Sequence, residues 1–207
     1  MINNNDFVEI FEKRLCDYTG APYAVAVDRC TNAILLCMEY LIRTRVGSKA
    51  RPLEIPAHTY ISIPMTLINY GYDIRLISRG WYEHYEIGKT GVHDYAVGFN
   101  ADMYVPGQMQ CVSFQQKKRL AIGKGGAILL DDPDVAAMLR RMRHDGRDSS
   151  KATVDDTGII HGYHMYMSPD EAAKGILLIN QSLPNYAPGS NFDYPDAREI
   201  ECLKDYQ

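Results

Sequence analysis

Short apolar strands alternate with amphipathic helices along the first part of the chain, and this alternation restricts the fold more than any other feature of the sequence. Apolar residues recur at three- and four-residue steps in the helical segments and cluster in the short segments between them. We predict helices over residues 5–18, 31–45 and 61–70, and strands over residues 23–28 (YAVAVD), 52–56 (PLEIP) and 73–78 (DIRLIS). Repeated strand–helix–strand units favour an α/β fold with a mainly parallel sheet and helices on both faces.

The central part of the chain adds strands without long helices between them. VHDYAV, QCVSF and GGAILL are further strand candidates, which brings the expected sheet to about six strands. A helix that follows two aspartates and a proline is expected to turn Arg140, Arg141 and Arg143 towards water, and SPDE has the form of a capping box that begins another helix. We expect residues 1–181 to form one α/β domain, and residues 182–207 to form an irregular tail packed on that domain or on a partner chain.

Composition and residue spacing argue against several classes of function. The formal net charge of −4 gives no electrostatic reason to expect nucleic acid as a partner, because domains that bind phosphate backbones carry a basic excess. No segment approaches the roughly 18 apolar residues of a membrane span, and the first residues lack a secretory pattern, so we expect a cytoplasmic protein. The cysteines form no CxxC pair and the histidines show no ligand spacing, so neither a disulfide framework nor a metal site is expected.

Several predicted strands end at residues that can bind a ligand. Because ligands of open α/β sheets bind at the carboxyl ends of the strands, these residues are expected to share one crevice. The first strand leads to Cys30 and Thr31 at the start of a helix, where free backbone amides can hold a phosphate. The second strand leads to Tyr60, and the later strands carry Asp94 and Ser113. Together they offer a phosphate site, an aromatic side chain and a carboxylate.

The segment SFQQKKRLAIGKGGA adds an amine to this set. It places Lys117 and Lys118 between a strand and a glycine cluster that cannot be the interior of a helix. Taken alone, the two lysines are most simply solvated surface charges, as basic runs usually are. In isolation Asp94 is equally compatible with a surface turn, and Tyr60 with the core.

In their order along the chain, these segments resemble the motifs of the DegT/StrS family of pyridoxal-phosphate-dependent sugar aminotransferases, which has the aspartate-aminotransferase fold. FEKRLCDYTGAPYAVAVDRCTNAI stands where the family has FE…YTG.PYAVAV, a short S-G-T-type turn and a helix. PAHTYIS corresponds to a proline followed by T-aromatic-x-S/A. SFQQKKRLAIGKGGA matches the most specific motif, in which SF is followed by three residues, lysine, four residues and G-x-G-G.

This resemblance implies a role for each candidate residue. Lys118 would form a Schiff base with pyridoxal 5'-phosphate and would then move a proton between the substrate carbon and the cofactor. Asp94 would keep the pyridine nitrogen protonated, and Tyr60 would stack on the cofactor ring. The cofactor phosphate would be held by Ser113 and by the backbone amides of Cys30 and Thr31.

The sequence also departs from the family pattern. The chain is shorter than full-size members, so we expect the small C-terminal domain to be missing, and the short segment before Asp94 predicts one strand fewer in the sheet. Val97 stands where the family often has Gln or His against the ring. In GYHMY, His164 replaces the asparagine and Tyr166 the arginine of the family's GY-N-x-R. His164 is expected to reach the cofactor phosphate of a partner subunit, which implies a homodimer with shared active sites.

The resemblance implies an aminotransferase that moves an amino group from glutamate, the family's usual donor, to a nucleotide-linked keto-sugar through Lys118. An alternative from another class is a catalytically reduced protein that keeps the fold, for cofactor binding or for an interaction, without turnover. Retention of Lys118 argues against this alternative, whereas the missing domain argues for it. Dehydration with the same cofactor is a third possibility, which the lysine disfavours because family dehydratases replace it.

Overall fold

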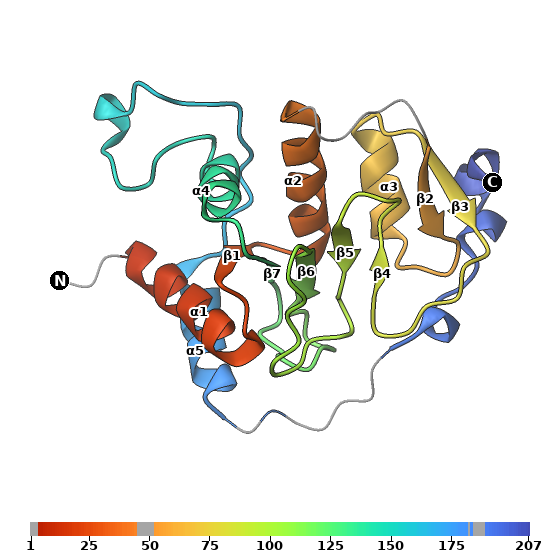
Figure 1. The fold of residues 1–207 in the computed structure, drawn as a ribbon, viewed down its shortest axis with the longest axis horizontal. Helices are drawn as coiled ribbons and strands as arrows, with labels where there is room; N and C mark the ends of the chain where they lie inside the picture. The colour runs from red at the N-terminus through yellow and green to blue at the C-terminus, as the bar shows by residue number, and fades with distance from the viewer. Residues whose placement is uncertain (1–3, 45–51, 182, 184–188) are drawn as a thin grey trace.

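The computed structural model describes residues 4–44, 52–181, 183 and 189–207 and shows an α/β fold (Figure 1). Its helices and strands are, in chain order, α1 (Asn4–Thr19), β1 (Tyr23–Val27), α2 (Cys30–Arg43), β2 (Leu53–Pro56), α3 (Ser62–Asn69), β3 (Ile74–Ile77), β4 (Tyr85–Glu86), β5 (Val92–Asp94), β6 (Met109–Ser113), β7 (Gly126–Leu130), α4 (Pro133–Met142) and α5 (Pro169–Ile179). Short 3-10 helices cover Thr153–Asp155, Asn191–Asp193, Ala197–Glu199 and Glu201–Tyr206. The expected segments recur with ends shifted by a few residues, while β4 was not expected and the predicted helix end at Arg45 lies outside the described residues.

The strands form two sheets in the described part of the chain. The larger sheet has five strands in the order β1-β7-β6-β5-β4, and β2 and β3 form a separate parallel pair. Within the larger sheet only β5 and β6 are parallel, whereas β1 and β7, β6 and β7, and β4 and β5 run antiparallel. The expected sheet of about six mainly parallel strands is therefore wrong, although the α/β class is confirmed.

Short connections explain why the larger sheet is mixed. Parallel neighbours need a long crossover, usually a helix, whereas antiparallel neighbours can be joined by a turn. The chain passes from β6 to β7 through the lysine and glycine segment, which contains no helix, and from β4 to β5 through a tight turn at Gly88 and Gly91, both with positive φ. Apart from β4, the strands lie where they were expected, but the missing crossovers at these two connections fix the antiparallel direction.

Two glycines in this connection allow β7 to begin close to the N-terminus of α2. A Cβ atom on Gly126 would lie 2.5 Å from the backbone nitrogen of Cys30 and 2.8 Å from the carbonyl oxygen of Val112, so no side chain fits there. Gly125 adopts a φ of 125°, which other residues rarely adopt, and its carbonyl accepts a hydrogen bond from the Phe114 amide. The glycine cluster therefore brings the lysine turn and the start of α2 together.

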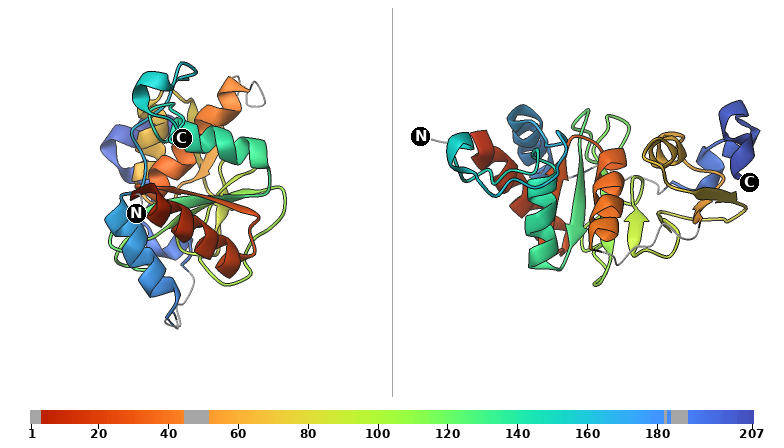
Figure 2. Two further views of the ribbon diagram at one scale, coloured as in Figure 1. Left: turned by 90° about the vertical axis from the view of Figure 1, so that its left-hand side faces the viewer. Right: turned by 90° about the horizontal axis from the view of Figure 1, so that it is seen from above.

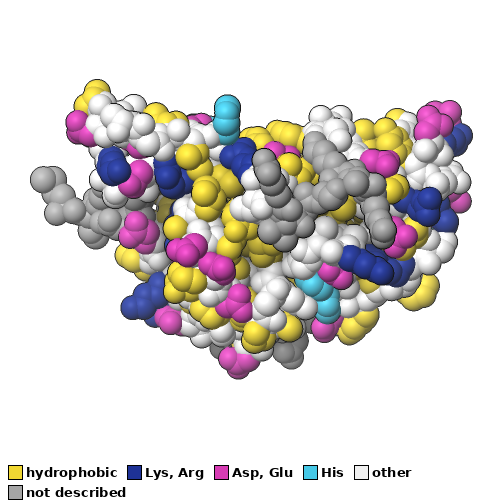
Figure 3. Space-filling view, turned by 45° about the horizontal axis from the view of Figure 1, so that its top comes forward, with side chains coloured by type: hydrophobic (Ala, Val, Ile, Leu, Met, Phe, Trp, Pro, Cys, Tyr) yellow, Lys and Arg dark blue, Asp and Glu magenta, His cyan; other side chains and the backbone are white. Residues whose placement is uncertain are grey.

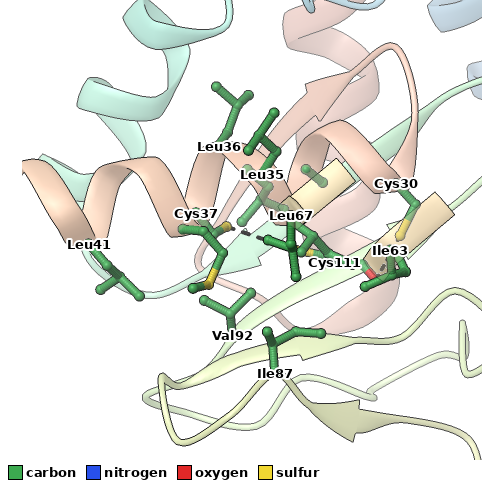
Figure 4. Close-up of a cluster of buried hydrophobic side chains, with 14 of the residues drawn as sticks. Cys30, Leu35, Leu36, Cys37, Leu41, Ile63, Leu67, Ile87, Val92 and Cys111 are labelled. Atoms are coloured by element: carbon green, nitrogen blue, oxygen red, sulfur yellow. Dashed lines mark hydrogen bonds between the residues drawn. The ribbon is translucent and has the colours of Figure 1, made fainter. Parts of the chain in front are cut away.

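Helices cover both faces of the larger sheet, as expected. α1 and α5 pack on one face, where they bury aromatic and aliphatic side chains that include Phe11, Phe114 and Leu129. α2 packs on the opposite face, with α4 beside it and beside β1. Figure 4 shows the second cluster, in which leucines of α2 meet Leu67 of α3 and Val92 of β5. α2 packs on β5, β6 and β7 of the larger sheet and on α3, which contacts β3 of the smaller sheet. Each fully buried aliphatic side chain in this cluster contributes about 1.5–3 kcal/mol.

The arginines of α4 correct a second expectation. Arg143 is only 9% exposed and binds the buried carboxylate of Glu12, and Arg140 places Nη2 2.9 Å from the same carboxylate. Both arginines also donate to backbone carbonyls of β1, at Ala24 and Ala26, while the Ala26 amide donates to Glu12 at 2.9 Å. β1 is an edge strand with unpaired backbone groups, so these charged side chains satisfy the edge and do not form a solvated face.

The described C-terminal residues pack against the smaller sheet. The Ala197 amide donates to the Ala57 carbonyl at 2.9 Å, and Leu203 is buried with 1% exposure. Figure 2 shows α1 and α5 at one end of the molecule, and β2, β3 and the C-terminal 3-10 helices at the opposite end. The expected division into a domain of residues 1–181 and a tail of residues 182–207 stays a prediction.

The surface and the helices give few further constraints. Basic and acidic side chains are both present on the face shown in Figure 3. Among the residues that the structure describes, no helix is long and apolar enough to cross a membrane, and no group of three or more potential metal ligands comes together.

Candidate active site

A cavity of about 900 Å³ opens where the N-terminus of α2, the ends of β5 and β6, the glycine cluster and the described C-terminal residues meet. Six of the predicted site residues line it: Cys30, Thr31, Tyr60, Asp94, Ser113 and Lys118. These residues come from positions spread over almost ninety residues of sequence. The fold therefore brings together an amine, a carboxylate, an aromatic ring and a helix N-terminus, as the strand-end argument predicted.

The two adjacent lysines have different surroundings. The turn after β6 is closed by a hydrogen bond of 2.8 Å from the Lys118 amide to the Gln115 carbonyl, and the Lys117 amide binds the Gln115 side chain at 2.9 Å. This turn leaves Lys117 exposed and half-buries Lys118. Burial lowers the pKa of the Lys118 ammonium group, against the opposing effect of Asp94. Lys118 is therefore the lysine whose neutral, nucleophilic form is favoured.

Asp94 lies at the floor of the cavity with 6% exposure. Its Oδ1 accepts the Ala96 amide at 2.9 Å, and its Oδ2 accepts the Tyr85 hydroxyl at 2.9 Å. Burial raises the pKa of the Asp94 carboxyl, whereas these hydrogen bonds and the Lys118 charge lower it. The site thus holds a buried carboxylate that can face a cationic nitrogen.

The N-terminus of α2 forms the anion-binding side of the cavity. Its N-cap residue, Arg29, has extended backbone angles and makes no side-chain cap, so the first amides of the helix are not occupied by a capping side chain. The Thr31 hydroxyl lies 2.7 Å from the Ser62 hydroxyl at the start of α3, and Ser113 is buried beside the cavity with 7% exposure. The Cys30 thiol lies 3.4 Å from the Cys111 carbonyl oxygen. Hydroxyls, amides and the helix dipole together suit a phosphate group.

Aromatic rings form another wall. Tyr60 is 59% exposed and meets Tyr194 edge to face, with ring centroids 6.4 Å apart. Tyr194 is tilted against Trp81 at 5.8 Å, and Trp81 against Tyr85 at 5.3 Å. The cavity therefore has Tyr60 at its open side and a more buried group of rings behind it.

Sequence reasoning missed several residues of this cavity. Trp81 and Tyr85 line it, as do Asp193 and Tyr194 from the C-terminal segment. Tyr85 belongs to β4, a strand of two residues that is too short to show a hydrophobic pattern. Thr59, which follows the second predicted strand together with Tyr60, was expected at this crevice and also lines it. The contribution of the C-terminal segment depends on tertiary packing, for which the sequence carries no local signal.

His164 is the one predicted site residue that the structure places elsewhere. It is exposed, and its Nδ1 lies 3.0 Å from Oδ2 of Asp145. Its ring meets Tyr166 edge to face at 4.7 Å. The role predicted for His164 is a contact with the cofactor of a partner subunit. Its position outside the cavity of its own chain does not test that role, which stays a prediction.

Comparison with known sequences identifies the family. The sequence profile of the DegT/DnrJ/EryC1/StrS aminotransferase family matches residues 1–77 and 104–181, which is more than half of the chain. The lysine segment lies inside this match, whereas Asp94, Trp81 and Tyr85 lie in the unmatched stretch between the two parts. No curated protein is significantly similar to the chain.

Solved structures share the fold at low sequence identity. AtS13 from Actinomadura melliaura is 16% identical with a TM-score of 0.72, and the similarity covers 84% of this chain and 60% of that one. The sugar aminotransferase CalS13 from Micromonospora echinospora is 14% identical with a TM-score of 0.67, covering 84% and 61%. Helicobacter pylori PseC, an aminotransferase involved in the biosynthesis of pseudoaminic acid, is 16% identical with a TM-score of 0.64, covering 84% and 57%. The chain thus spans about three fifths of the length of these relatives, and at these identities the likeness shows the fold alone.

Proposed function

The chain belongs to the DegT/DnrJ/EryC1/StrS aminotransferase family, and we propose that it binds pyridoxal 5'-phosphate at Lys118 and transfers an amino group from glutamate to a nucleotide-linked keto-sugar. The observation that carries this proposal is the pairing of a half-buried lysine with a buried aspartate inside one cavity. The lysine occupies the position that the family motif requires, while Asp94 lies outside the matched residues and is supported by the geometry alone.

The cavity residues fit the chemical groups of this cofactor. The uncapped start of α2, with Thr31 and Ser113, suits the phosphate, and Asp94 suits the ring nitrogen. Gly126 leaves no space for a side chain between β7 and α2, so the two elements pack closely beside the phosphate side of the cavity. When bound, the cofactor supplies an aldehyde for the lysine and an aromatic ring that takes up electrons from the substrate carbon.

The protein's own part in the reaction is to hold charges and move protons. Half-burial lowers the pKa of Lys118, which makes its neutral amine, the form that attacks and carries a proton, easier to reach. Asp94, opposite it, stabilises positive charge on the ring nitrogen when ionised. Tyr60, at the open side, can cover the face of the ring.

The substrate class is proposed from the surroundings of the cavity and from relatives. Arg29, Lys117 and Lys124 line the cavity and are exposed, so its opening is cationic and suits an anionic substrate such as a sugar linked to a nucleotide diphosphate. The relative CalS13 is a sugar aminotransferase. Because the chain spans about three fifths of the length of its relatives, its activity on such a substrate rests on experiment.

We further propose a cytoplasmic homodimer in which His164 of each chain contributes to the site of the other. His164 is exposed and lies outside its own cavity, as a residue that serves a partner must. The symmetry of a two-fold dimer would provide two equivalent sites.

Spectra of the purified protein with added pyridoxal 5'-phosphate test the proposal. Trp81 is the sole tryptophan of the chain and lines the cavity, so binding should quench its fluorescence together with the appearance of a visible absorption band. Borohydride reduction followed by peptide mapping should place the cofactor on Lys118, and modification of Lys117 in its place would contradict the motif alignment.

Addition of glutamate separates the two functional classes. Loss of the visible band on addition of glutamate, with formation of 2-oxoglutarate, supports amino transfer. A band that forms on Lys118 but does not respond to glutamate or to other amino donors supports the alternative, a protein that binds the cofactor without turnover. Failure to form the band at all would contradict cofactor binding.

A further inference from the structure

Three buried polar side chains stand in a row along the wall of the cavity. The Thr59 hydroxyl lies 2.5 Å from the Tyr85 hydroxyl, which lies 2.9 Å from Oδ2 of Asp94. Their exposed fractions are 3%, 5% and 6%, so bulk water does not compete for these hydrogen bonds. The row joins the end of β2 to β4 and β5, and hence links the two sheets.

The number of available protons determines which group donates each hydrogen bond in this row. An ionised carboxylate only accepts hydrogen bonds, so the Tyr85 hydroxyl must donate its single proton to Asp94. Burial raises the pKa of Tyr85 well above its ordinary value, so the hydroxyl keeps that proton at neutral pH. The remaining contact then requires the Thr59 hydroxyl to donate to the Tyr85 oxygen. Each member of the row is therefore oriented towards the charge of Asp94.

Backbone pairing and ring packing hold Tyr85 in this position. Tyr85 and Asp94 are register partners in the antiparallel pair of β4 and β5, so their side chains leave the same face of the sheet. The Tyr85 ring packs against Trp81 with centroids 5.3 Å apart. The sheet register therefore sets the distance between the Tyr85 hydroxyl and the Asp94 carboxylate.

Asp94 keeps an acceptor position free for a ligand. Oδ1 accepts hydrogen bonds from the Ala96 amide and from the Cys30 thiol, and Oδ2 accepts one from Tyr85, whereas each carboxylate oxygen can accept two. The charged group that faces it is Lys118, and the thiol of Cys30 lies 4.0 Å from Oδ1. The row thus holds Oδ2 of the carboxylate by one hydrogen bond and leaves its second acceptor position available.

We propose that Tyr85, supported by Thr59, is a positioning residue that keeps Asp94 ionised and oriented towards the cavity. The importance of Tyr85 for catalysis rests on the proposed function, in which Asp94 faces the cofactor nitrogen. The effect of Tyr85 on Asp94 is independent of that function. Once the amine of Lys118 is engaged by the cofactor, that ammonium charge no longer stabilises the carboxylate, and the row supplies hydrogen bonds that persist.

The test is the titration of Asp94 in the cofactor-free protein. Carbon NMR of protein labelled at the aspartate side-chain carboxyl, with the Asp94 signal assigned by its absence in Asp94→Asn, gives the pKa directly. Tyr85→Phe removes a hydrogen bond to a charged group, so the pKa of Asp94 should rise by about one unit or more. Thr59→Val should raise it in the same direction by less, because it acts through Tyr85.

A matched control is present in the same fold. The Tyr163 hydroxyl donates to Oε2 of Glu39 at 2.8 Å, which is another tyrosine-to-carboxylate hydrogen bond, away from the cavity. Tyr163→Phe should leave the Asp94 titration unchanged. An unshifted Asp94 in folded Tyr85→Phe, or an equal shift in Tyr163→Phe, overturns the proposal.

Two safeguards keep the outcome decisive. If Tyr85→Phe does not fold, Thr59→Val alone must shift the Asp94 titration, and an unchanged value there overturns the proposal. Because the titration needs no cofactor, a protein that fails to bind pyridoxal 5'-phosphate but shows the shift would contradict the proposed function and leave the role of Tyr85 intact. A protein that binds pyridoxal 5'-phosphate but shows no shift would contradict the role of Tyr85 and leave the proposed function intact.

Discussion

The two charged groups that face each other across the cavity come from contrasting segments. Lys118 lies in the turn between β6 and β7, inside the family match and inside its most specific motif. Asp94 ends β5, a strand of three residues, in the stretch of residues 78–103 that the family profile does not match. A constrained turn with an ordered pattern of glycines thus delivers the amine, and a short hairpin with a buried hydrogen-bond row delivers the carboxylate.

This difference shows how unequal sequence signals can support one site. The lysine side depends on backbone geometry: Gly126 has no room for a Cβ, so the motif is visible as glycines at fixed spacing. The aspartate-bearing side depends on side-chain hydrogen bonds among Thr59, Tyr85 and Asp94, which come from separate segments of the chain. The first constraint is easy to see in a sequence, and the second is visible only in three dimensions.

Removal of the amine should have the largest effect on function. Lys118→Ala should abolish the visible band of the cofactor and all amino transfer, because no other amine is half-buried beside Asp94 among the described cavity residues. Its free energy of unfolding should change by no more than about 1 kcal/mol, since the side chain is not part of the core. Absorption spectra and urea unfolding measure the two effects.

Lys117→Ala is the matched control for this change. Lys117 is the exposed neighbour of Lys118 and should keep the band and the activity when it is replaced. A Lys117 variant without the band, or a Lys118 variant with it, would reverse the assignment of the two lysines.

Removal of the carboxylate charge should have the next largest effect. Asp94→Asn keeps the shape of the side chain but does not stabilise a cationic ring nitrogen, so single-turnover rates should fall by roughly two orders of magnitude or more while the cofactor still binds. Rapid mixing of the cofactor-loaded protein with glutamate measures the rate. Unchanged rates would give Asp94 a different role.

The same variant makes a prediction about stability and pH. Burial raises the pKa of Asp94 in the folded chain, so the folded state binds the proton more tightly than the unfolded state does. The stabilising contribution of the protonated carboxyl is therefore complete at low pH and is lost as the pH rises through the raised pKa. In urea unfolding without cofactor, wild type should lose stability relative to Asp94→Asn over that range, and a difference independent of pH would contradict the raised pKa.

Some parts of this structure could be predicted from the sequence and others could not, for physical reasons. Helix periods, the capping box at Ser168 and the strand cores were predicted because they depend on nearby residues, and the structure contains both hydrogen bonds of that box. Strand direction was predicted wrongly because it depends on the crossovers, and the buried pair of Glu12 and Arg143 was missed because a sequence does not show which edge strand needs partners. In the site, residues tied to motifs came together, whereas Tyr85 and the C-terminal wall required the fold.

Two glycines allow the backbone constraint on each side to be compared directly. Gly126→Ala would place a Cβ 2.5 Å from the Cys30 backbone nitrogen, on the lysine side. Gly98→Ala would place one 2.9 Å from the Glu83 carbonyl oxygen, on the aspartate side. Gly126→Ala should cost about 3 kcal/mol of unfolding free energy and weaken cofactor binding, and Gly98→Ala about 1 kcal/mol, because the first overlap is deeper and lies between packed elements. Urea unfolding compares them, and equal costs would show that the lysine side is no more constrained.

The smallest expected signal concerns a residue on neither side of the cavity. If His164 completes the site of a partner subunit, His164→Ala should weaken cofactor retention and activity without removing the visible band, since Lys118 and Asp94 are unchanged. Mixing chains that carry Lys118→Ala with chains that carry His164→Ala then creates dimers in which one site lacks both residues and the other is intact. With random exchange, half of the dimers are mixed, so about a quarter of all sites should be intact, and activity should rise above the average of the two variants measured separately. Asp145→Ala, which removes the hydrogen-bond partner of His164 and no predicted site residue, is the control. A monomer in sedimentation, or no rise on mixing when both variants are defective alone, would confine each active site to a single chain.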